Sequence, residues 1–496
     1  MSSDGPRRVL TRTYAPGPNV VVPDLGGLPG VTRSDYPLTV GLTTTYVDTA
    51  DLALARAGVR LSLRTGGDQD AWLVTFPWRG RDDAELTPVG TDPGRVPAPL
   101  RDLVQGWVRG RDLVEVARVE TGRTSRDVLD EDDAVVARLV DEAATGTVGR
   151  DQVRWRQWVL HSRQASFLES ADRFMAESGI APGDRLDEVT RLLGPRLADR
   201  EGPAELSRRA PVARVLGARL REQHDALLRA HVELRRGHEH GVHAARVALR
   251  RLRSALATYR PALSAEPTHR LRDELGWLSR ALGAARDRHV VRERLVALAE
   301  SETEIAGPVL ERIRSASWTS ESETSVAEVL GSQRHVDLLG MLDGFVAEPP
   351  WTERADRAAG PFLRRRVATE WERLAARVAL VSGSEPGTAS DEDLHEIRKA
   401  AKRLRYALET AELVWPRKPK GLRKRVRKLT ELLGERQDTV VTRAALLELA
   451  AEADAAGEPT FTHGRLDRIE ELHAVVLEER FHRAWSGALD QRADWP

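Results

Sequence analysis

The chain has 496 residues, of which 41% are hydrophobic and 31% charged, which is enough for about two to four domains with ordinary apolar cores. Its formal net charge of +0 argues against a globally basic nucleic-acid coat protein, and its lack of cysteine excludes disulfides and thiolate metal sites. No run reaches the roughly 18 to 20 apolar residues that cross a bilayer, and residues 1–20 lack the apolar stretch of a signal peptide, so we expect a cytoplasmic protein without membrane contact.

The first part of the chain, to about residue 165, has the short alternating apolar runs that are typical of β-strands. Glycine, aspartate and proline turns separate these runs, which lie at 46–48, 59–64, 71–76, 134–140 and 153–161. Helical spacing interrupts them at 51–57, 99–108 and 164–177. The sequence therefore predicts an α+β class, with a first domain at residues 1–195 and a linker at residues 196–211.

Several segments of this first domain resemble the CYTH family of triphosphate tunnel metalloenzymes. The resemblance rests on Tyr46-Val47-Asp48-Thr49, Asp51-Leu52, residues 61–64 and residues 72–77. It implies an antiparallel β-barrel tunnel in which basic residues hold a triphosphate and acidic residues hold Mg²⁺ or Mn²⁺. Residues of the matching type are retained at Arg64, Arg118, Arg123 and Asp141, and we expect the three arginines to be weak residual phosphate contacts in the tunnel.

The residues that carry catalysis in that family have no counterpart of the same charge here. The family's Glu-x-Glu-x-Lys strand, two further basic positions and three acidic positions correspond to Val9, Thr11, Thr13, Ser62, Thr75, Gln157, Val159 and His161. No lysine occurs before Lys399, so the loss of the lysines holds for any alignment. Because a metal ion needs several oxygen ligands that converge on one point, we predict a catalytically silent tunnel with no catalytic residue, metal or cofactor.

A substitute metal site is the alternative for this domain. Glu120, Asp141 and Glu142 could together supply the carboxylates that the signature lacks. The protein would then be a metal-dependent triphosphatase or polyphosphate-processing enzyme.

The second part of the chain has helical periodicity from residue 212 onward and no strand pattern. It predicts an all-α domain at residues 212–490. Breaks at 348–351 and 382–390 divide this domain into two units, at about 212–345 and 355–490. Ser390 followed by Asp393 is typical of a helix N-terminal cap at the start of the second unit's basic helix.

A basic helical pattern occurs twice in this domain, 152 positions apart. Each copy is a histidine followed three, seven and ten residues later by a cation: His243, Arg246, Arg250 and Arg253, then His395, Arg398, Lys402 and Arg405. At ~100° per residue, each set of four lies within roughly 80° of arc, beside an apolar face. A second echo relates Leu282-Gly283 and Asp287 to Leu433-Gly434 and Asp438. The two patterns predict an internal duplication that packs as paired bundles with pseudo-two-fold symmetry.

Both copies of the pattern resemble the CHAD domain, the conserved-histidine α-helical family, over roughly residues 212–490. The resemblance implies two four-helix bundles whose basic surface binds inorganic polyphosphate and associates with polyphosphate granules. The predicted polyphosphate-binding residues are the ones that match the family: His243, Arg246, Arg250, Arg253, His395, Arg398, Lys402 and Arg405.

The charges of these two copies agree with such a ligand. Cations one turn apart repel one another, so a stripe present twice suggests a ligand with many successive negative charges. Arginine offers bidentate hydrogen bonds and lysine a compact charge, and protonation of the histidines should tighten binding below about pH 6.5. Asp287 and Asp438 would repel a polyanion, so we expect them to hold arginines in place.

A further basic run lies at residues 417–428, which contain no acidic residue. We expect five of its cations to extend the polyphosphate-binding surface: Lys420, Arg423, Lys424, Arg427 and Lys428. The alternative is a solvated helix face, which is the usual meaning of a charge run.

Two other functions compete with polyphosphate binding. A metal site at His238, Glu239 and His240 is disfavoured, because residues two apart diverge on a helix. A nucleic-acid-binding role is disfavoured because few aromatic residues interleave with the cations. The sequence therefore predicts a non-enzymatic polyphosphate-binding protein of the cytoplasm and its polyphosphate granules, with the metal-dependent enzyme and the nucleic-acid-binding protein as alternatives.

Overall fold

The computed structural model describes residues 9–67, 70–78, 85–88, 94–183, 187–197, 205–302, 307–315, 325–383 and 385–492. The side chains at 85, 86, 88, 239, 284–290, 307, 308, 491 and 492 lie outside this description. The chain forms two compact units, at residues 1–202 and 203–496. None of the described helices is long and apolar enough to cross a bilayer.

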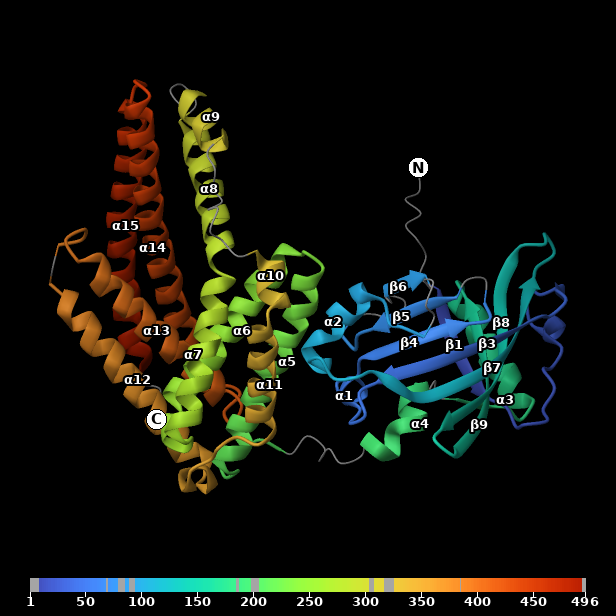
Figure 1. Cartoon of the computed structure of the whole chain (residues 1–496). Helices are drawn as coiled ribbons and strands as arrows, with labels where there is room; N and C mark the ends of the chain where they lie inside the picture. Colours follow the sequence, from blue (N-terminus) through green and yellow to red (C-terminus); the bar gives the residue numbers. More distant parts are fainter. Residues whose placement is uncertain are drawn as a thin grey trace. The chain divides into compact units, whose positions relative to one another are not determined.

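The first unit is built on one antiparallel sheet, drawn in blue to teal in Figure 1. Its strands are β1 (Leu10–Ala15), β2 (Arg33–Ser34), β3 (Leu38–Asp48), β4 (Arg60–Thr65), β5 (Ala71–Thr75), β6 (Glu85–Pro88), β7 (Val114–Leu129), β8 (Val135–Val148), β9 (Asp151–Ser162) and β10 (Ala181–Pro182). Its helices are η1 (Leu25–Gly27), α1 (Ala53–Arg56), α2 (Ala98–Val108), α3 (Ala165–Glu177) and α4 (Glu188–Leu197). The mixed strand and helix content agrees with the predicted α+β class.

The described strands form an open sheet rather than the predicted closed barrel. They pair in the order β10-β1-β9-β8-β7-β3-β4-β5-β6, and β2 pairs with β7 outside this path. The ends of the order are β10, with two residues, and β6, with four. Edge strands this short offer few backbone groups for a ladder between them, and no pairing within the described part of the chain joins them.

The two faces of the sheet carry separate apolar cores. Because side chains alternate along a strand and paired residues share a face, the strand register assigns each residue to a face. Val119 and Ala144 lie on the face that α4 covers through Leu193. Tyr14 and Leu160 lie on the opposite face, which α3 covers. Helices on both faces therefore bury alternate residues of the central strands.

The described elements of the second unit are all helices, as predicted. Its elements are α5 (Val212–Arg235), α6 (Glu239–Thr258), η2 (Arg260–Ala262), α7 (Ala265–Ala281), α8 (Ala284–Ser301), α9 (Gly307–Ser315), α10 (Val326–Gly331), α11 (Gln333–Ala347), η3 (Glu353–Asp356), α12 (Ala359–Val381), α13 (Asp391–Ala411), α14 (Lys420–Ala455) and α15 (Phe461–Arg492). The predicted cap of α13 is confirmed, because the Ser390 side chain accepts a hydrogen bond from the Asp393 amide.

Eight of the described helices pack in two groups of four. One group contains α5, α6, α7 and α11, and the other contains α12, α13, α14 and α15. Stacked rings of Trp371 and Trp485, 5.2 Å apart, join α12 to α15. The groups contact each other through α5 with α12 and α6 with α13, and α8, which is in neither group, contacts α14. That the two groups arose by duplication stays a prediction from the sequence.

The two halves differ at the Leu-Gly pair, where the helix is interrupted in the first half and continuous in the second. In the second half α14 runs through Leu433-Gly434 as one helix of 36 residues. In the first half the chain ends α7 before Leu282-Gly283 and resumes as α8. Beyond that break α8 and α9 lie beside α14 and α15, as Figure 1 shows, and share the apolar core of Leu295, Ile313, Leu446 and Leu466. The interruption between α7 and α8 thus allows α8 and α9 to pack against α14 and α15.

Candidate functional site

A pocket of about 310 Å³ lies where α6, α8, α13 and α14 meet. Four of the predicted binding residues line it, His243, Arg246 and Arg250 from α6 and Arg398 from α13. The remaining lining residues are Val247, Val291, Arg294, Gln437, Asp438, Val441 and Thr442. Cations from both copies of the duplicated pattern therefore converge on one concave site.

The sequence spacing on α6 explains how three polar side chains reach this pocket together. His243, Arg246 and Arg250 are separated by three and four residues, which stacks them along one helix face. The adjacent face carries Leu249 and Leu252, both fully buried. Burial of each leucine side chain stabilises the fold by about 2 kcal/mol. This fixes the rotation of the helix about its axis, so the cations are held toward the pocket.

In each copy of the pattern, the first arginine lies beside the glycine of the repeated Leu-Gly pair. Arg246 donates from Nη1 to the backbone oxygen of Gly283, at 3.2 Å. In the second half the Arg398 guanidinium lies beside Gly434, where an added Cβ would be 3.9 Å from Nη2. The neighbouring His395 ring bonds Gln437, with 3.0 Å between Nδ1 and Oε1. An added Cβ would be tightly packed at Gly283, 3.4 Å from Arg246 Nη1, but would make only ordinary contact with Arg398 at Gly434.

Lys402 is surrounded by cations. Burial, followed by the charges of Arg398, Arg250 and Arg405, lowers the pKa of the Lys402 ammonium from 10.5 to about 7. Asp438 acts in the opposite direction and raises this pKa. A partly buried ammonium among three guanidinium groups is costly in the empty protein, and an anion placed there would relieve that cost.

Tyr406 links the two halves and has no signal in the duplicated pattern. Its hydroxyl accepts hydrogen bonds from Arg250 Nε at 2.5 Å and from Arg405 Nη2 at 2.8 Å. Arg405 also donates to Thr430 Oγ1 at 3.2 Å and lies over the Tyr406 ring, 4.7 Å from its centroid. The equivalent position of the first copy is Ser254, so comparison of the copies gave no indication of this tyrosine.

A second arginine cluster lies around Arg253, on α6, α7 and α13. Burial and then Arg272 and Arg280 lower the pKa of Arg253. Burial and then Arg403 lower the pKa of Arg272. The sequence analysis missed Arg272 and Arg280, although their spacing of eight residues on α7, with Gly276 between them, places them on one helix face.

Comparison with known proteins identifies the helical part. The family model described as "CHAD domain" matches residues 218–447. The chain is a CHAD-domain protein. It belongs to one family with two uncharacterized proteins from strains of Mycobacterium tuberculosis, each 31% identical over 498 residues that cover 94% of this chain and 93% of the relative.

Two solved structures are also similar to this chain. One is PptA from Streptomyces chartreusis, with a TM-score of 0.48 and 22% identity, covering 56% of this chain and 100% of that one. The other is the CHAD domain from the plant Ricinus communis, with a TM-score of 0.43 and 26% identity, covering 57% of this chain and 95% of that one.

The predicted cations at residues 420–428 lie in the first turns of α14, and three of them share a helix face with Asp438. Lys420, Lys424 and Lys428 are exposed, and Arg427 is exposed beside Glu431, at 3.4 Å. Arg423 is half-buried and paired with Glu412 at 2.6 Å, so a carboxylate already offsets its charge. At ~100° and ~1.5 Å per residue, Lys420, Lys424 and Arg427 lie within roughly 40° of Asp438 and roughly 17 to 27 Å along the helix from it.

Asp287 and Asp438 were both predicted to hold arginines in place, and the structure describes the side chain of Asp438 alone. Asp438 lines the pocket and acts on the Lys402 ammonium, as the residue type suggests. The side chain of Asp287 lies outside the described part of the structure. Arg294, which the sequence analysis did not select, also lines the pocket and is held by Glu470 at 2.7 Å.

In the sheet, the three predicted phosphate contacts do not share one face. The strand register places Arg64 and Arg123 on the face of Val119, and Arg118 on the opposite face. Arg118 is paired with Glu115 at 2.7 Å and Arg123 with Glu142 at 3.5 Å. A single tunnel-bound phosphate could not reach all three.

The alternative metal site in the sheet is also divided between faces. Glu142 shares a face with Arg123, whereas Glu120 and Asp141 lie on the other side, because the strand register alternates. Asp141 is bound by Arg156, with 2.6 Å between Oδ2 and Nη2. These three carboxylates therefore cannot ligate one ion.

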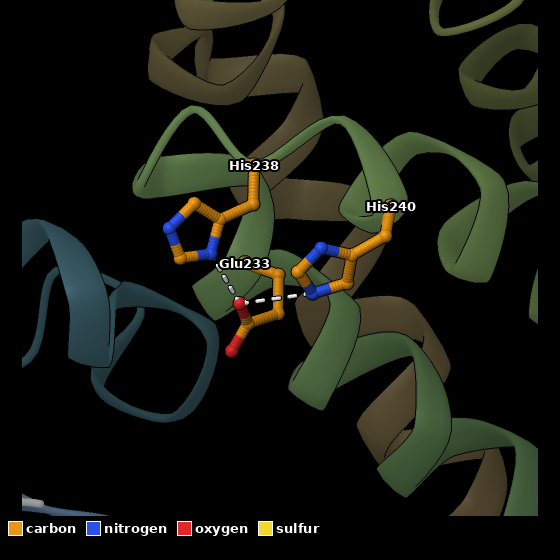
Figure 2. Close-up of side chains that lie close together, drawn as sticks. All are labelled: Glu233, His238 and His240. Atoms are coloured by element: carbon orange, nitrogen blue, oxygen red, sulfur yellow. Dashed lines mark hydrogen bonds and ion pairs between the residues drawn. The ribbon is translucent and has the colours of Figure 1, made fainter.

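One prediction about histidine was wrong in its geometry. His238 precedes the first turn of α6 in extended conformation, so the helical divergence of His238 and His240 does not apply. Figure 2 shows both rings turned toward the Glu233 carboxylate. Their nitrogens lie 2.7 Å and 3.2 Å from the same oxygen, Oε2.

Proposed function

We propose that this protein binds inorganic polyphosphate through its CHAD domain. The observation that carries the proposal is the convergence of His243, Arg246, Arg250 and Arg398 on one pocket. The residues come from helices about 150 positions apart in sequence, and their repulsion must be offset by packing or by a ligand. A ligand that presents several adjacent negative charges compensates them together.

The environment of Lys402 favours a polyanion over a single small anion. Arg250, Arg398 and Arg405 act electrostatically on Lys402, and Arg253, Arg272 and Arg280 form a further cluster on the same helical unit. The face of α14 that carries Asp438 also carries Lys420, Lys424 and Arg427. A flexible chain with about one charge per unit could follow these cations in succession.

The same site is poorly suited to reading nucleic-acid bases. No phenylalanine, tyrosine or tryptophan occurs among the described residues that line the pocket. Tyr406, the aromatic residue beneath the cations, is 3% exposed and uses its hydroxyl to hold Arg250 and Arg405. Base stacking, the usual source of single-strand affinity, has no platform there.

For the first unit we propose a catalytically silent CYTH-like scaffold. The strand register supports this resemblance, because the substituted positions Thr11, Thr13, Ser62, Thr75, Gln157, Val159 and His161 all fall on one face of the sheet. None of these side chains is a carboxylate or a lysine. Glu142 also lies on this face, but no group of three carboxylate or imidazole ligands among the described residues of this unit lies within 4.8 Å of one another, as binding of one Mg²⁺ would require.

Polyphosphate titration tests both proposals. The purified chain is titrated with long-chain polyphosphate by calorimetry, with RNA of matched total charge as competitor, while released phosphate is assayed with Mg²⁺ and Mn²⁺. We expect tight binding that RNA displaces poorly, without phosphate release. In cells, we expect the protein to associate with polyphosphate granules. Metal-dependent release would contradict the silent scaffold, and equal displacement by RNA would reduce the site to a general polyanion surface.

A double variant assigns the binding to this pocket. Arg250→Ala with Lys402→Ala is expected to weaken polyphosphate binding while helix content stays unchanged. The matched control is Arg468→Ala with Arg483→Ala, which removes the same number of charges from exposed positions of α15. Equal affinity of both double variants would show that the pocket is not the binding site.

A further inference from the structure

A group of potential metal ligands lies outside the CHAD pocket, where α5 ends and α6 begins. It consists of Glu233, His238 and His240, whose ligand atoms all lie within 4.8 Å of one another. Within the described part of the chain, no other group of three or more histidine, aspartate or glutamate ligands meets this distance. None of the three residues lines the polyphosphate pocket.

The backbone turn after α5 creates this convergence. Gly237 has a φ of 74°, which glycine adopts without strain, and its amide donates to Leu234 O at 3.0 Å. The His238 amide then donates to Glu233 O, also at 3.0 Å. These two hydrogen bonds define a Schellman motif, whose ends commonly carry an apolar pair in contact. Here the same contact is made by a carboxylate and an imidazole.

The two rings and the carboxylate are arranged as ligands of one ion would be. Atoms bound at about 2.0 to 2.2 Å to a tetrahedral ion lie roughly 3.3 to 3.5 Å apart. The observed separations from Glu233 Oε2 are 2.7 Å to His238 Nδ1 and 3.2 Å to His240 Nε2, so only small side-chain rotations are required. The rings also stack, with centroids 5.3 Å apart.

Burial and charge distinguish the roles of the three ligands. The Glu233 side chain is only 18% exposed and is therefore held in position, whereas His238 and His240 are 48% and 70% exposed. Arg236 lies 3.9 Å from the other carboxylate oxygen, Oε1, rather than from the oxygen that meets the two rings. The open side of the cluster faces solvent, which leaves access for an ion and for a further ligand.

We propose that Glu233, His238 and His240 bind a divalent transition-metal ion. Two imidazoles with one carboxylate are a set that suits Zn²⁺ or Co²⁺, whereas Mg²⁺ and Ca²⁺ select oxygen ligands. Three protein ligands leave at least one coordination position open for water or for another oxygen ligand. This site does not rest on polyphosphate binding and can exist without it.

Metal titration of the full chain, produced without a polyhistidine tag, tests the site. Zn²⁺ is titrated by calorimetry, and Co²⁺ is followed by its visible absorption, which reports the coordination geometry. We expect one equivalent to bind to the wild type. The affinity should fall by more than about tenfold in His238→Ala and in His240→Ala, since each removes a direct ligand.

Two further variants separate ligation from folding. Glu233→Gln keeps the shape of the side chain and the turn but removes the anionic ligand, so it should lose affinity while helix content is unchanged. His269→Ala removes an exposed histidine of α7 and should bind like the wild type. Absence of stoichiometric Zn²⁺ binding by the wild type, or equal affinity of His238→Ala and His269→Ala, would overturn the proposal.

Discussion

At the scale of single residues, the duplicated pattern does not make its two copies equivalent. His243, Arg246 and Arg250 line the pocket, whereas of the second copy only Arg398 does so. His395 instead bonds Gln437, and Arg405 is held by Tyr406 and Thr430. Cations of both copies, Arg250 from the first and Arg398 and Arg405 from the second, act electrostatically on Lys402.

Polyphosphate binding should take up a proton at Lys402. With a pKa of about 7, this amine is largely neutral at pH 8 and largely charged at pH 6, and a bound polyanion favours the charged form. Affinity is therefore expected to rise as pH falls from 8 to 6. Calorimetry in buffers of different ionisation enthalpy measures the proton uptake. Lys402→Arg, whose charge is permanent, should flatten the pH dependence, and an unchanged profile in that variant would contradict the assignment.

The same lowered pKa should be visible in stability. Between pH 7 and pH 10.5 the unfolded chain binds more protons at Lys402 than the folded chain, so the contribution of this residue to the free energy of unfolding increases with pH. Below pH 7 both states are charged and the folded state carries the full cost. Lys402→Met should therefore stabilise the empty protein at pH 7, by an amount that shrinks toward pH 10.5. Denaturant unfolding at several pH values measures this, and a destabilised Lys402→Met protein at pH 7 would refute it.

Tyr406 should matter through its hydroxyl rather than its ring. Tyr406→Phe removes the acceptor shared by Arg250 and Arg405, which we expect to cost about 1.5 to 3 kcal/mol of stability and to weaken polyphosphate binding. Thermal unfolding and calorimetry report the two effects. Tyr36→Phe is the matched control, because Tyr36 is 97% exposed in the other unit. Equal behaviour of the two variants would deny Tyr406 a role in positioning the arginines.

At the scale of helices, the Leu-Gly echo has a different role in each half. An added Cβ at Gly283 would lie 3.0 Å from Ser279 O and 3.2 Å from Arg280 O, at the break between α7 and α8. At Gly434, inside α14, it would meet only Arg398, at an ordinary 3.9 Å. An added side chain would therefore be tightly packed at Gly283 and would have ordinary space at Gly434.

Alanine substitution should separate these two roles. Gly434→Ala is expected to raise the free energy of unfolding by about 0.5 to 1 kcal/mol, because alanine favours the helix interior. Gly283→Ala should lower it, because the backbone at the break must shift and the bond from Arg246 to Gly283 O is disturbed. Thermal unfolding of both variants distinguishes them, and a shift of the same sign in both would contradict the distinction.

At the scale of the whole molecule, zero net charge coexists with a local cationic site. Carboxylates of α15 hold several arginines that face it, including Arg294 with Glu470, Arg436 with Glu478 and Arg443 with Asp467. The cations of α6 and α13 are gathered instead around the pocket and Lys402. Any attraction for a polyanion is therefore concentrated on the helical unit rather than spread over the chain.

Charge-driven binding should depend steeply on salt. If about six cations meet phosphates, affinity should fall roughly 10³-fold between 50 and 200 mM salt, as for other polyanions. Arg250→Ala with Lys402→Ala should reduce the slope of log affinity against log salt by roughly 0.7 to 0.9 per charge removed. Titrations at four salt concentrations measure both slopes. A slope unaffected by the double variant would exclude these residues from phosphate contact.

The class of each unit, the position of the basic helices and the choice of the α6 cations were predictable from the amino-acid sequence alone. These features depend on local periodicity, because burial of one helix face directs the polar residues of the other face outward. It also suggested the CHAD domain, which the match to residues 218–447 confirms. Short-range spacing was sufficient for these predictions.

What those residues contact could be learned only from the folded chain. The pocket joins α6, α8, α13 and α14, and the contacts of Arg294 and Tyr406 span about 150 to 180 positions. The open sheet and the separation of Arg118 from Arg123 follow from long-range strand register, and the convergence of His238 and His240 on Glu233 follows from one turn at Gly237. Pairing between distant segments depends on packing of the whole chain, which no local pattern encodes.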